Sequence, residues 1–378
     1  MVTTMLTVIG AGVIGLSCAW RAAAAGRAVT VLDPDPASGA SWVAGGMLAP
    51  VTEAWPGEEL LLDLGVAAVR RWPSFAAELG AAAGRPAGLR TEGTVVAATG
   101  AGDRAELDTL AEHLAGLGRA VDRLTGRELR RLEPALGPDV RGGLSVPDDL
   151  AVDNRVLLAA LRTAAERAGV RFVADAALAV LDDGARVTGV RTEAGVRPAE
   201  RVLVAAGAHS AGLHPALRGL VRPVKGEVLR LAHRAGALPP PARTVRALVD
   251  GRPIYAVPRD GGGLVIGATQ AEQGFDTEVT VGGVRDLLRD AERVLPGIAE
   301  YALVETAAGL RPGSPDNLPL IGAPGPAGLL VATGHHRNGM LLAPITADAM
   351  LALLAGDPVP DPVRAADPRR FAVQPAGR

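Results

Sequence analysis

Cysteine, net charge and long apolar runs are all scarce in this sequence, and each shortage excludes a class of protein. The single cysteine, Cys18, rules out an intrachain disulfide and argues against a cysteine-based metal site. The formal net charge is −2, so no overall attraction draws the chain to nucleic acid or to an anionic membrane. We therefore expect neither nucleic acid nor a membrane as a partner.

Membrane-spanning and secretory segments are not expected either. No apolar run reaches the ~18–20 residues needed to cross a bilayer. The first residues, MVTTMLTVIGAG, read as a strand entering a turn and lack the segments of a signal peptide. We expect a cytoplasmic protein. Its 378 residues, 48% hydrophobic and 21% charged, indicate two interlocked globular domains.

The N-terminal residues carry the pattern of a βαβ unit. A short apolar run at residues 5–9 stops at Gly10, helical spacing follows over residues 16–25, and residues 28–33 alternate as a strand. The turn between the first strand and the helix reads GAGVIG. Its glycines permit a tight turn, close approach of a pyrophosphate and close packing of the helix on the sheet.

This turn predicts a binding site for an adenine dinucleotide. The N-terminus of the helix offers free N–H groups and a partial positive charge to the phosphates. Asp33, at the end of the second strand, can accept hydrogen bonds from ribose hydroxyls and disfavours a 2′-phosphate. The motif therefore argues against NADP, but it does not separate NAD from FAD.

Other elements follow from hydrophobic periodicity and turn residues. Helices are predicted over residues 58–83, 102–118, 126–132, 152–169 and about 281–294. Strands are predicted at 94–99, 170–175, 185–195, 199–207 and 226–232, and a hairpin at 255–269. The proline-rich stretch 238–241 is predicted to be a loop, and the tail after about 357 to be irregular.

Several segments spread along the chain carry a family resemblance. They are VIGAGVIGLSCAW, AGGML, PVKGE (223–227), YAVPRDGGGLVIGAT, AGLRPGSPDNLPLIG and TGHHRNGMLLAP, and they extend from residue 8 to 344. With them the sequence resembles the D-amino-acid oxidase superfamily of FAD-dependent amine oxidases, and within it the glycine oxidases of thiamine biosynthesis. The resemblance implies an α/β (α+β overall) fold. A discontinuous Rossmann-like FAD domain would take residues 1–84, 142–222 and 306–378. An inserted substrate domain with an antiparallel sheet would take 85–141 and 223–305.

The resemblance implies FAD as the cofactor. No cysteine lies in the C-terminal half and no histidine in the first 110 residues, so FAD is expected to bind noncovalently. The residues that the family motifs place at FAD are Gly10, Gly12, Val13, Ile14, Gly15, Asp33, Pro34, Ser41, Trp42, Gly46, Met47, Leu48, Leu178, Gly207, Gly334, His335, His336, Arg337, Asn338, Gly339, Met340 and Leu341.

The activity implied by the resemblance is the oxidation of an amino acid. The α-hydrogen passes to flavin N5, the imine hydrolyses to an α-keto acid and ammonia, and oxygen reoxidises the flavin to give hydrogen peroxide. Such a transfer needs no strong base, but it needs an anchor for the substrate carboxylate. Arg311 is the predicted anchor, because a guanidinium can bind a carboxylate through two parallel bonds. Arg337 would contact the substrate or brace its loop, and Tyr255 would border the active site.

The predicted substrate is glycine, with sarcosine and small D-amino acids as further options. Gly251, Pro253 and Gln270 depart from the glycine oxidase pocket and leave the amine open. The resemblance also implies oxygen as a second substrate and a homotetramer.

The segment GHHRNG invites a metal-site interpretation, which we do not favour. Neighbouring residues of a helix or strand point in different directions, so His335 and His336 are poorly arranged to bind one ion, and no metal is predicted. The pattern instead predicts a strand that ends at Gly334, a turn, and a helix that starts near Met340. The N-terminus of that helix would face the flavin's pyrimidine edge, where its N–H groups would stabilise negative charge.

Three alternatives stay open at this point. The chain could be a D-amino-acid or N-methyl-amino-acid oxidase or dehydrogenase on the same scaffold. It could be an NAD-dependent dehydrogenase, although GLRPG and GHHRNG would then have no explanation. It could also be a noncatalytic nucleotide-binding subunit.

We expect the purified protein to be yellow, because noncovalent FAD would stay bound and absorb visible light. Heat or acid should release the flavin, which absorption and fluorescence spectra of the supernatant would identify. A colourless preparation that binds NAD would contradict this prediction.

Overall fold

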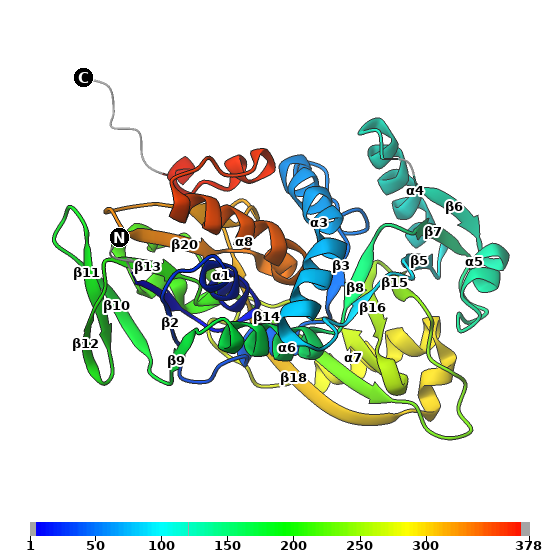
Figure 1. Cartoon of the computed structure of the whole chain (residues 1–378). Helices are drawn as coiled ribbons and strands as arrows, with labels where there is room; N and C mark the ends of the chain where they lie inside the picture. The colour runs from blue at the N-terminus through cyan, green and yellow to red at the C-terminus, as the bar shows by residue number, and fades with distance from the viewer. Residues whose placement is uncertain (1–4, 120, 372–378) are drawn as a thin grey trace.

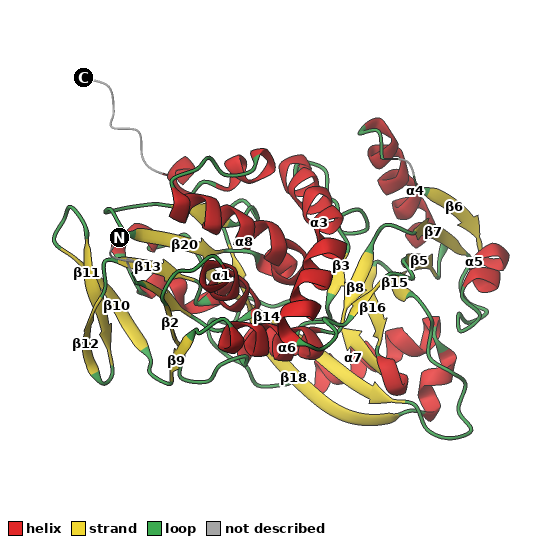
Figure 2. Ribbon diagram, in the orientation of Figure 1, coloured by secondary structure: helices red, strands yellow, loops and turns green. Residues whose placement is uncertain are grey.

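The computed structural model describes residues 5–119 and 121–371 and has two large sheets side by side (Figure 1). Helices surround both of them (Figure 2). The first sheet has six strands in the order β19 (Leu320–Gly322), β20 (Leu329–Thr333), β13 (Arg201–Val204), β1 (Leu6–Ile9), β2 (Val29–Leu32) and β9 (Arg171–Val173). All neighbours in it are parallel except β19 and β20.

The six-stranded sheet is covered on both faces because its strands carry apolar residues on each face. Leu6 and Val8 of β1 belong to one core together with the helices α1 (Val13–Ala24), α3 (Glu59–Ala83), α6 (Asn154–Arg167) and α8 (Gly339–Ala355). Ile9 belongs to a second core, shared with the three-stranded sheet of β10 (Ala177–Asp182), β11 (Val187–Thr192) and β12 (Gly195–Pro198). This is the layered arrangement that buries a parallel sheet.

The second sheet has eight strands and is mostly antiparallel. Its order is β18 (Ala302–Gly313), β14 (Arg222–Ala232), β17 (Gly263–Gly267), β16 (Arg252–Pro258), β15 (Thr244–Val249), β5 (Thr94–Ala98), β7 (Gly142–Val146) and β6 (Asp122–Thr125). Only the pair β15–β5 is parallel. The helix α7 (Val281–Val294) packs on one face through Leu287, Ala291 and Val294. The helix α4 (Ala101–Gly116) packs on β5 and β7.

Shorter elements complete the chain. A small sheet joins β3 (Met47–Leu48), β8 (Leu150–Val152) and β4 (Leu89–Arg90). The short helices are α2 (Gly39–Val43), α5 (Gly126–Leu132), η1 (Gly207–Gly212), η2 (Pro215–Leu217), η3 (Asp260–Gly262), η4 (Pro296–Glu300), η5 (His336–Asn338), η6 (Asp361–Ala366) and η7 (Pro368–Phe371).

The predicted mixed fold, with a Rossmann-like unit and an inserted antiparallel sheet, is confirmed. Some boundaries differ. The first helix starts at Val13, directly after the glycine turn, and part of the tail forms η6 and η7. Residues 372–378 of that tail lie outside the described residues. β7 pairs with β5 in the eight-stranded sheet, whereas the sequence-based division assigns residues 142–146 to the FAD domain.

One helix of the structure is long and apolar enough to span a membrane by length and composition alone, although charged residues interrupt its apolar run. Residues His336–Ala355 form a continuous helical stretch of 20 residues with a mean hydropathy of 1.5. In the fold this stretch packs against α1 and α3, and 67% of its apolar window is buried. The indole of Trp72 in α3 donates to the carbonyl of Leu341, 2.9 Å away. These contacts make it a core helix.

Replacing Gly15 by alanine should destabilise the protein. A Cβ atom there would lie 1.9 Å from the carbonyl oxygen of Gly10, a backbone atom that cannot rotate away. Overpacking of this kind costs about 1–3 kcal/mol. Thermal unfolding should therefore show a midpoint several degrees lower. Gly102→Ala is the matched control, because a Cβ there meets nothing within 4 Å and alanine favours helix. Equal midpoints for Gly15→Ala and Gly102→Ala would contradict the packing argument.

Candidate functional site

A cavity of about 750 Å³ lies between the two large sheets and is lined by residues of both. Its size is within the range of cofactor and ligand sites. One end is formed by the glycine turn, Asp33 and Ala177. Arg246, Tyr255 and Arg311 of the eight-stranded sheet line it as well. We call the part formed by these three residues, Glu53 and Arg337 the charged end.

The glycine turn has the geometry that a pyrophosphate requires. Gly10 has a φ of 104°, and a Cβ there would lie 2.4 Å from the carbonyl oxygen of Ala205. The Oδ2 atom of Asp33 accepts a hydrogen bond from the N–H of Ala11 at 2.6 Å. The hydroxyl of Ser41 accepts from the N–H of Val13 at 3.0 Å, at the first residue of α1. Because a side chain is excluded at Gly10 and the turn leads directly into the N-terminus of α1, the turn fits the diphosphate of an adenine dinucleotide.

The segment 39–47 is fixed in place by the buried amide of Asn154. Its Nδ2 atom donates to the carbonyls of Ser41 and Trp42 at 2.9 and 2.8 Å. Its Oδ1 atom accepts from Arg230 and Arg259 at 3.2 and 3.1 Å. Burial lowers the pKa of Arg259 to about 10, so this guanidinium stays charged at neutral pH. The network ties the segment 39–47 to β14 through Arg230 and to the residue that follows β16, Arg259.

Strand alternation brings Arg246 and Tyr255 to the cavity. Val245 and Ala247 belong to the core under α7, so Arg246 faces the opposite side of the sheet. The same reasoning applies to Tyr255, which pairs with Arg246 across β15 and β16. Burial raises the pKa of the Tyr255 phenol, which therefore stays protonated at neutral pH.

Two glycines of neighbouring strands give these side chains room. A Cβ on Gly226 of β14 would lie 2.2 Å from Nη1 of Arg311, so the guanidinium lies across that strand. A Cβ on Gly267 of β17 would lie 2.2 Å from the hydroxyl oxygen of Tyr255. We call Gly226 and Gly267 the glycine floor. The side chains of Arg311 and Tyr255 lie over it from opposite sides, because β14 and β17 lie between β18 and β16.

Arg311 keeps its charge available. Its Nη1 atom donates to the carbonyls of Lys225 and Thr269, each at 3.2 Å, which orients the guanidinium. Within residues 5–119 and 121–371, Arg311 forms no ion pair. A guanidinium that lines a cavity without a counter-ion is suited to binding a carboxylate.

Arg337, in contrast, is already paired. Its Nε atom lies 3.2 Å from Glu53, and its Nη2 atom lies 3.4 Å from Glu58. Glu53 also pairs with Arg246 at 2.6 Å. Burial opposes the ionisation of Glu53, but Arg246 and Arg337 outweigh it and lower the pKa of its carboxyl. Of the two roles considered for Arg337, this geometry favours bracing the loop.

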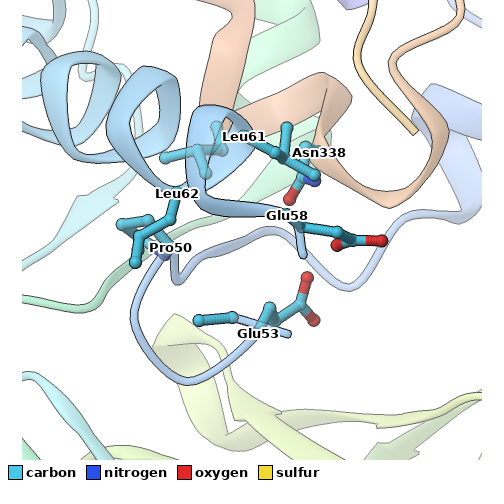
Figure 3. Close-up of a pocket in the computed structure, with 8 residues that line it drawn as sticks. Pro50, Glu53, Glu58, Leu61, Leu62 and Asn338 are labelled. Carbon is cyan, nitrogen blue, oxygen red and sulfur yellow. The ribbon is translucent and has the colours of Figure 1, made fainter. Parts of the chain in front are cut away.

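Glu53 and Glu58 also line a second, water-sized cavity of about 10 Å³, which Figure 3 shows beside Pro50, Leu61, Leu62 and Asn338. Their segment is held by Asp149, which accepts from the N–H groups of Val51 and Thr52 at 3.1 and 2.7 Å. Burial raises the pKa of Asp149 to about 6. Glu53 and Glu58 therefore line their cavities from a loop that Asp149 holds in place.

The GHHRNG segment is a strand end, a short 3₁₀ turn and a helix start, as predicted. His335 lies 3.1 Å from the hydroxyl of Thr346, and burial lowers the pKa of its imidazole to about 3. His336 has a φ of 47°, and burial, followed by the charge of Arg337, lowers its pKa to about 4. Both rings are thus neutral at physiological pH. Among the described residues no group of three or more metal-binding side chains occurs.

The cavity brings together most of the predicted site residues. Those that line it are Arg311, Arg337, Tyr255, Gly10, Gly12, Val13, Ile14, Asp33, Pro34, Ser41, Gly46, Met47, Gly207, His335, His336, Gly339 and Met340. Those that do not are Gly15, Trp42, Leu48, Leu178, Gly334, Asn338 and Leu341. Leu178 and Trp42 are exposed, Leu48 is buried in the core, and Asn338 and Leu341 line the smaller cavity.

Sequence reasoning missed four residues that shape this site: Glu53, Arg246, Asp149 and Asn154. Arg246 carried a signal, because it is the one charged residue of a strand otherwise made of Thr, Val, Ala and Leu. The other three act through contacts with distant segments, which no local pattern reveals.

The fold and the site indicate an enzyme that binds an adenine dinucleotide, and comparison with known proteins identifies its family. The model of the family described as FAD dependent oxidoreductase (DAO) matches residues 5–353. The chain belongs to this family, and its cofactor is FAD. The choice between nicotinamide and flavin that the glycine turn left open is thereby made, and the NAD-dependent alternative is set aside.

Three relatives illustrate the similarity. The chain is 34% identical to the bifunctional protein ThiO/ThiG of Synechocystis sp., over 98% of this chain and 54% of that protein. It thus spans about half the length of the first curated relatives. It is 33% identical to the glycine oxidase of Geobacillus kaustophilus, over 90% of each chain. The crystal structure of the latter enzyme covers 98% of this chain and all of its own with a TM-score of 0.89. The iminodiacetate oxidase of Chelativorans sp. has a TM-score of 0.84 at 29% identity, covering 96% and 98% of the two chains.

The buried neutral His336 should make stability depend on pH. Its pKa of about 4 in the fold lies below the ordinary 6.5, so the unfolded chain binds the proton first as pH falls. The stabilisation is fully present above pH 6.5 and is lost as pH falls from there toward 4. In this window the ring contributes a slope of about 1.4 kcal/mol per pH unit to the free energy of unfolding.

Denaturant unfolding of wild type and His336→Phe at several pH values tests this. The variant should show the shallower decline, because phenylalanine binds no proton, while contributions of other groups, Asp149 among them, cancel in the comparison. Parallel curves would show that His336 is protonated equally in both states.

Proposed function

We propose that this protein oxidises glycine, or a small N-substituted glycine such as sarcosine, to glyoxylate with release of the amine and hydrogen peroxide. The observation that carries the proposal is Arg311, whose oriented guanidinium lines the cavity without a counter-ion. The similarity to proteins named glycine oxidase supports the choice of substrate.

FAD, when bound, accepts two electrons and a hydrogen from the substrate carbon and delivers the electrons to oxygen. The glycine turn and Asp33 would hold its adenine half, and the segments 39–47 and 335–340 its other half. The protein's own task is positioning. Arg311 binds the substrate carboxylate, and the protonated Tyr255 hydroxyl can donate to the same group. The reaction needs no side chain that acts as a strong base.

The start of α8 would assist by electrostatics. Gly339 and Met340 line the cavity at the first turn of this helix, whose N-terminal N–H groups have no partners inside the helix. We propose that these groups stabilise negative charge on the reduced cofactor. His336 is neutral and adds no positive charge here, so the stabilisation would come from the backbone.

D-amino acids on the same scaffold are the second candidate. Gln270 and Pro253 both line the cavity, so polar and small side chains stand at its wall and leave space for a substituent on the α-carbon. Gly251 does not line the cavity and bears on the choice less directly. On the strength of the family resemblance we also propose a homotetramer, and on that of composition a cytoplasmic location.

Arg311→Ala should lower kcat/KM for glycine by roughly 100-fold or more, because two charge-assisted bonds to the carboxylate are lost. The dissociation constant of FAD should change little, since Arg311 is not in the glycine turn. Arg311→Lys should recover part of the loss, as it keeps the charge but not the fork. Peroxide release measures activity, and flavin fluorescence measures FAD binding.

Arg285→Met, at a residue of α7 whose side chain is 71% exposed, is the control and should match wild type. Full activity of Arg311→Ala would remove the anchor role. A wild type that retains FAD and releases no peroxide from any small amino acid would overturn the proposed function itself.

A further inference from the structure

We infer that Glu227 is a positioning residue for the carboxylate anchor, because it holds in place the backbone that orients the guanidinium of Arg311. The inference rests on the proposed role of Arg311 and deepens it. Glu227 belongs to β14 and is 3% exposed, yet it is not among the residues that line the cavity.

The side chains of Glu227 and Lys225 lie on the face of β14 that points away from the cavity. Gly226 and Val228 line the cavity, and successive residues of a strand point to opposite faces of the sheet. Both charged side chains are buried there, under α7, which packs on β14. Neither can contact a ligand in the cavity, so any effect on the ligand must pass through another residue.

That other residue is Arg311, because its orientation depends on the backbone around Glu227. Its Nη1 atom donates to the carbonyls of Lys225 and Thr269, which lie on either side of the guanidinium's path across β14. The carbonyl of Lys225 is fixed by the ladder, since it also accepts from the N–H of Ala271 at 3.1 Å, and the N–H of Lys225 donates to Ala271 at 2.8 Å.

The carbonyl of Thr269 is fixed by Glu227 through three hydrogen bonds. The N–H of Thr269 donates to the carbonyl of Glu227 at 3.3 Å, and the N–H of Glu227 donates to the hydroxyl of Thr269 at 2.9 Å. The same hydroxyl donates to Oε2 of Glu227 at 3.2 Å. A hydroxyl has one hydrogen, so the carboxylate determines where it points and leaves a lone pair for the N–H.

The helix α7 gives the carboxylate a firm support. Oε1 of Glu227 accepts from the N–H of Thr280 at 2.8 Å, and Oε2 accepts from its hydroxyl at 3.4 Å. Thr280 is the N-cap of α7, and a Cβ on Gly283 in the first turn would clash with Oε2. Negative charge is favoured at this end of a helix. Glu227 thus connects the start of α7 to the carbonyl that orients Arg311.

The ammonium of Lys225 completes the network. It lies 3.9 Å from Oε1 of Glu227, which gives the buried carboxylate a nearby counter-ion. It also pairs with Asp276, within the segment 269–280. This segment, which forms part of the cavity wall, is therefore held at both ends by Glu227 and between them by Lys225.

The direction of the guanidinium matters for a carboxylate more than for other groups. Two parallel bonds require the planes of guanidinium and carboxylate to coincide. If the carbonyl of Thr269 turned away, Arg311 would keep its charge and its place in the cavity but could rotate out of that plane. Loss of Glu227 should therefore weaken the binding of a carboxylate and leave FAD binding unchanged.

Binding of methoxyacetate, which has a carboxylate but no amine to oxidise, measures this effect directly. The FAD-loaded enzyme would be titrated with it, with calorimetry and the flavin absorption spectrum as readouts. Glu227→Ala should raise the dissociation constant by about tenfold, which corresponds to one charge-assisted bond. Glu227→Gln, which keeps the shape and can still accept one bond, should raise it by a smaller factor.

Turnover of glycine should show the same effect as a split between KM and kcat. The carboxylate is bound in the ground state and the transition state alike, so KM should rise with methoxyacetate's dissociation constant while kcat stays within about twofold of wild type.

Thr280→Val is the matched control. It removes a hydroxyl that contacts the same carboxylate, but on the side of α7. Because an N-cap is lost, the unfolding midpoint should fall. The dissociation constant of methoxyacetate should match wild type. This variant separates a loss of stability from a loss of positioning.

A double-mutant cycle tests whether Glu227 acts through Arg311. In the Arg311→Lys background the oriented fork is absent, so Glu227→Ala should change the dissociation constant by less than about twofold. If Glu227→Ala does not fold, Glu227→Gln in both backgrounds carries the same comparison.

The outcomes separate this role from the proposed function. Unchanged methoxyacetate binding in both Glu227 variants, or an equal loss in the Arg311→Lys background, would overturn the positioning role even if glycine is oxidised. A loss that requires Arg311, in a protein that releases no peroxide from any small amino acid, would keep the positioning role and reject the proposed reaction. A wild type that binds no methoxyacetate would reject the anchor and its positioning together.

Discussion

The amide of Asn154 is the contact on which the cavity depends. It begins α6 in the layer that covers the six-stranded sheet, and it binds the carbonyls of Ser41 and Trp42 and the guanidiniums of Arg230 and Arg259. One buried side chain thus joins a cofactor-side segment to the eight-stranded sheet. Because both of its polar atoms are used twice, a change at this position would remove four hydrogen bonds from a buried region, although Arg230 and Arg259 keep contacts with the carbonyls of Trp42 and Gly45.

The charged end follows a related logic. Its three arginines and Glu53, together with Glu58 and the two neutral histidines of the neighbouring segments, are kept in defined states by pairing or by burial. The charge of Arg337 is compensated by Glu53 and Glu58. Arg311 donates only to carbonyl groups, so its charge remains available to a ligand. Residues of one type therefore have different roles, which their partners determine.

Sequence patterns predicted those parts of the site that are formed by a few consecutive residues. The glycine turn with Asp33, and the strand, turn and helix of GHHRNG, rest on steric and hydrogen-bonding rules that act within a few residues. Glu53, Asp149 and Asn154 act across large sequence separations, so their roles depend on which strands become neighbours. The apolar stretch at 336–355 shows the converse: composition alone does not say whether a helix is buried by protein or by lipid, and the contacts with α1 and α3 decide it.

The glycine floor has a consequence for how such an enzyme can change. Any side chain at Gly226 or Gly267 would occupy the space of Arg311 or Tyr255, so the bottom of the binding region tolerates almost no variation. Diversity must enter at the walls, where Gln270, Pro253 and Trp55 line the cavity from loops and strand ends. The substrate range of related enzymes would then change through substitutions at these wall residues. Arg311 and the glycine floor would stay the same.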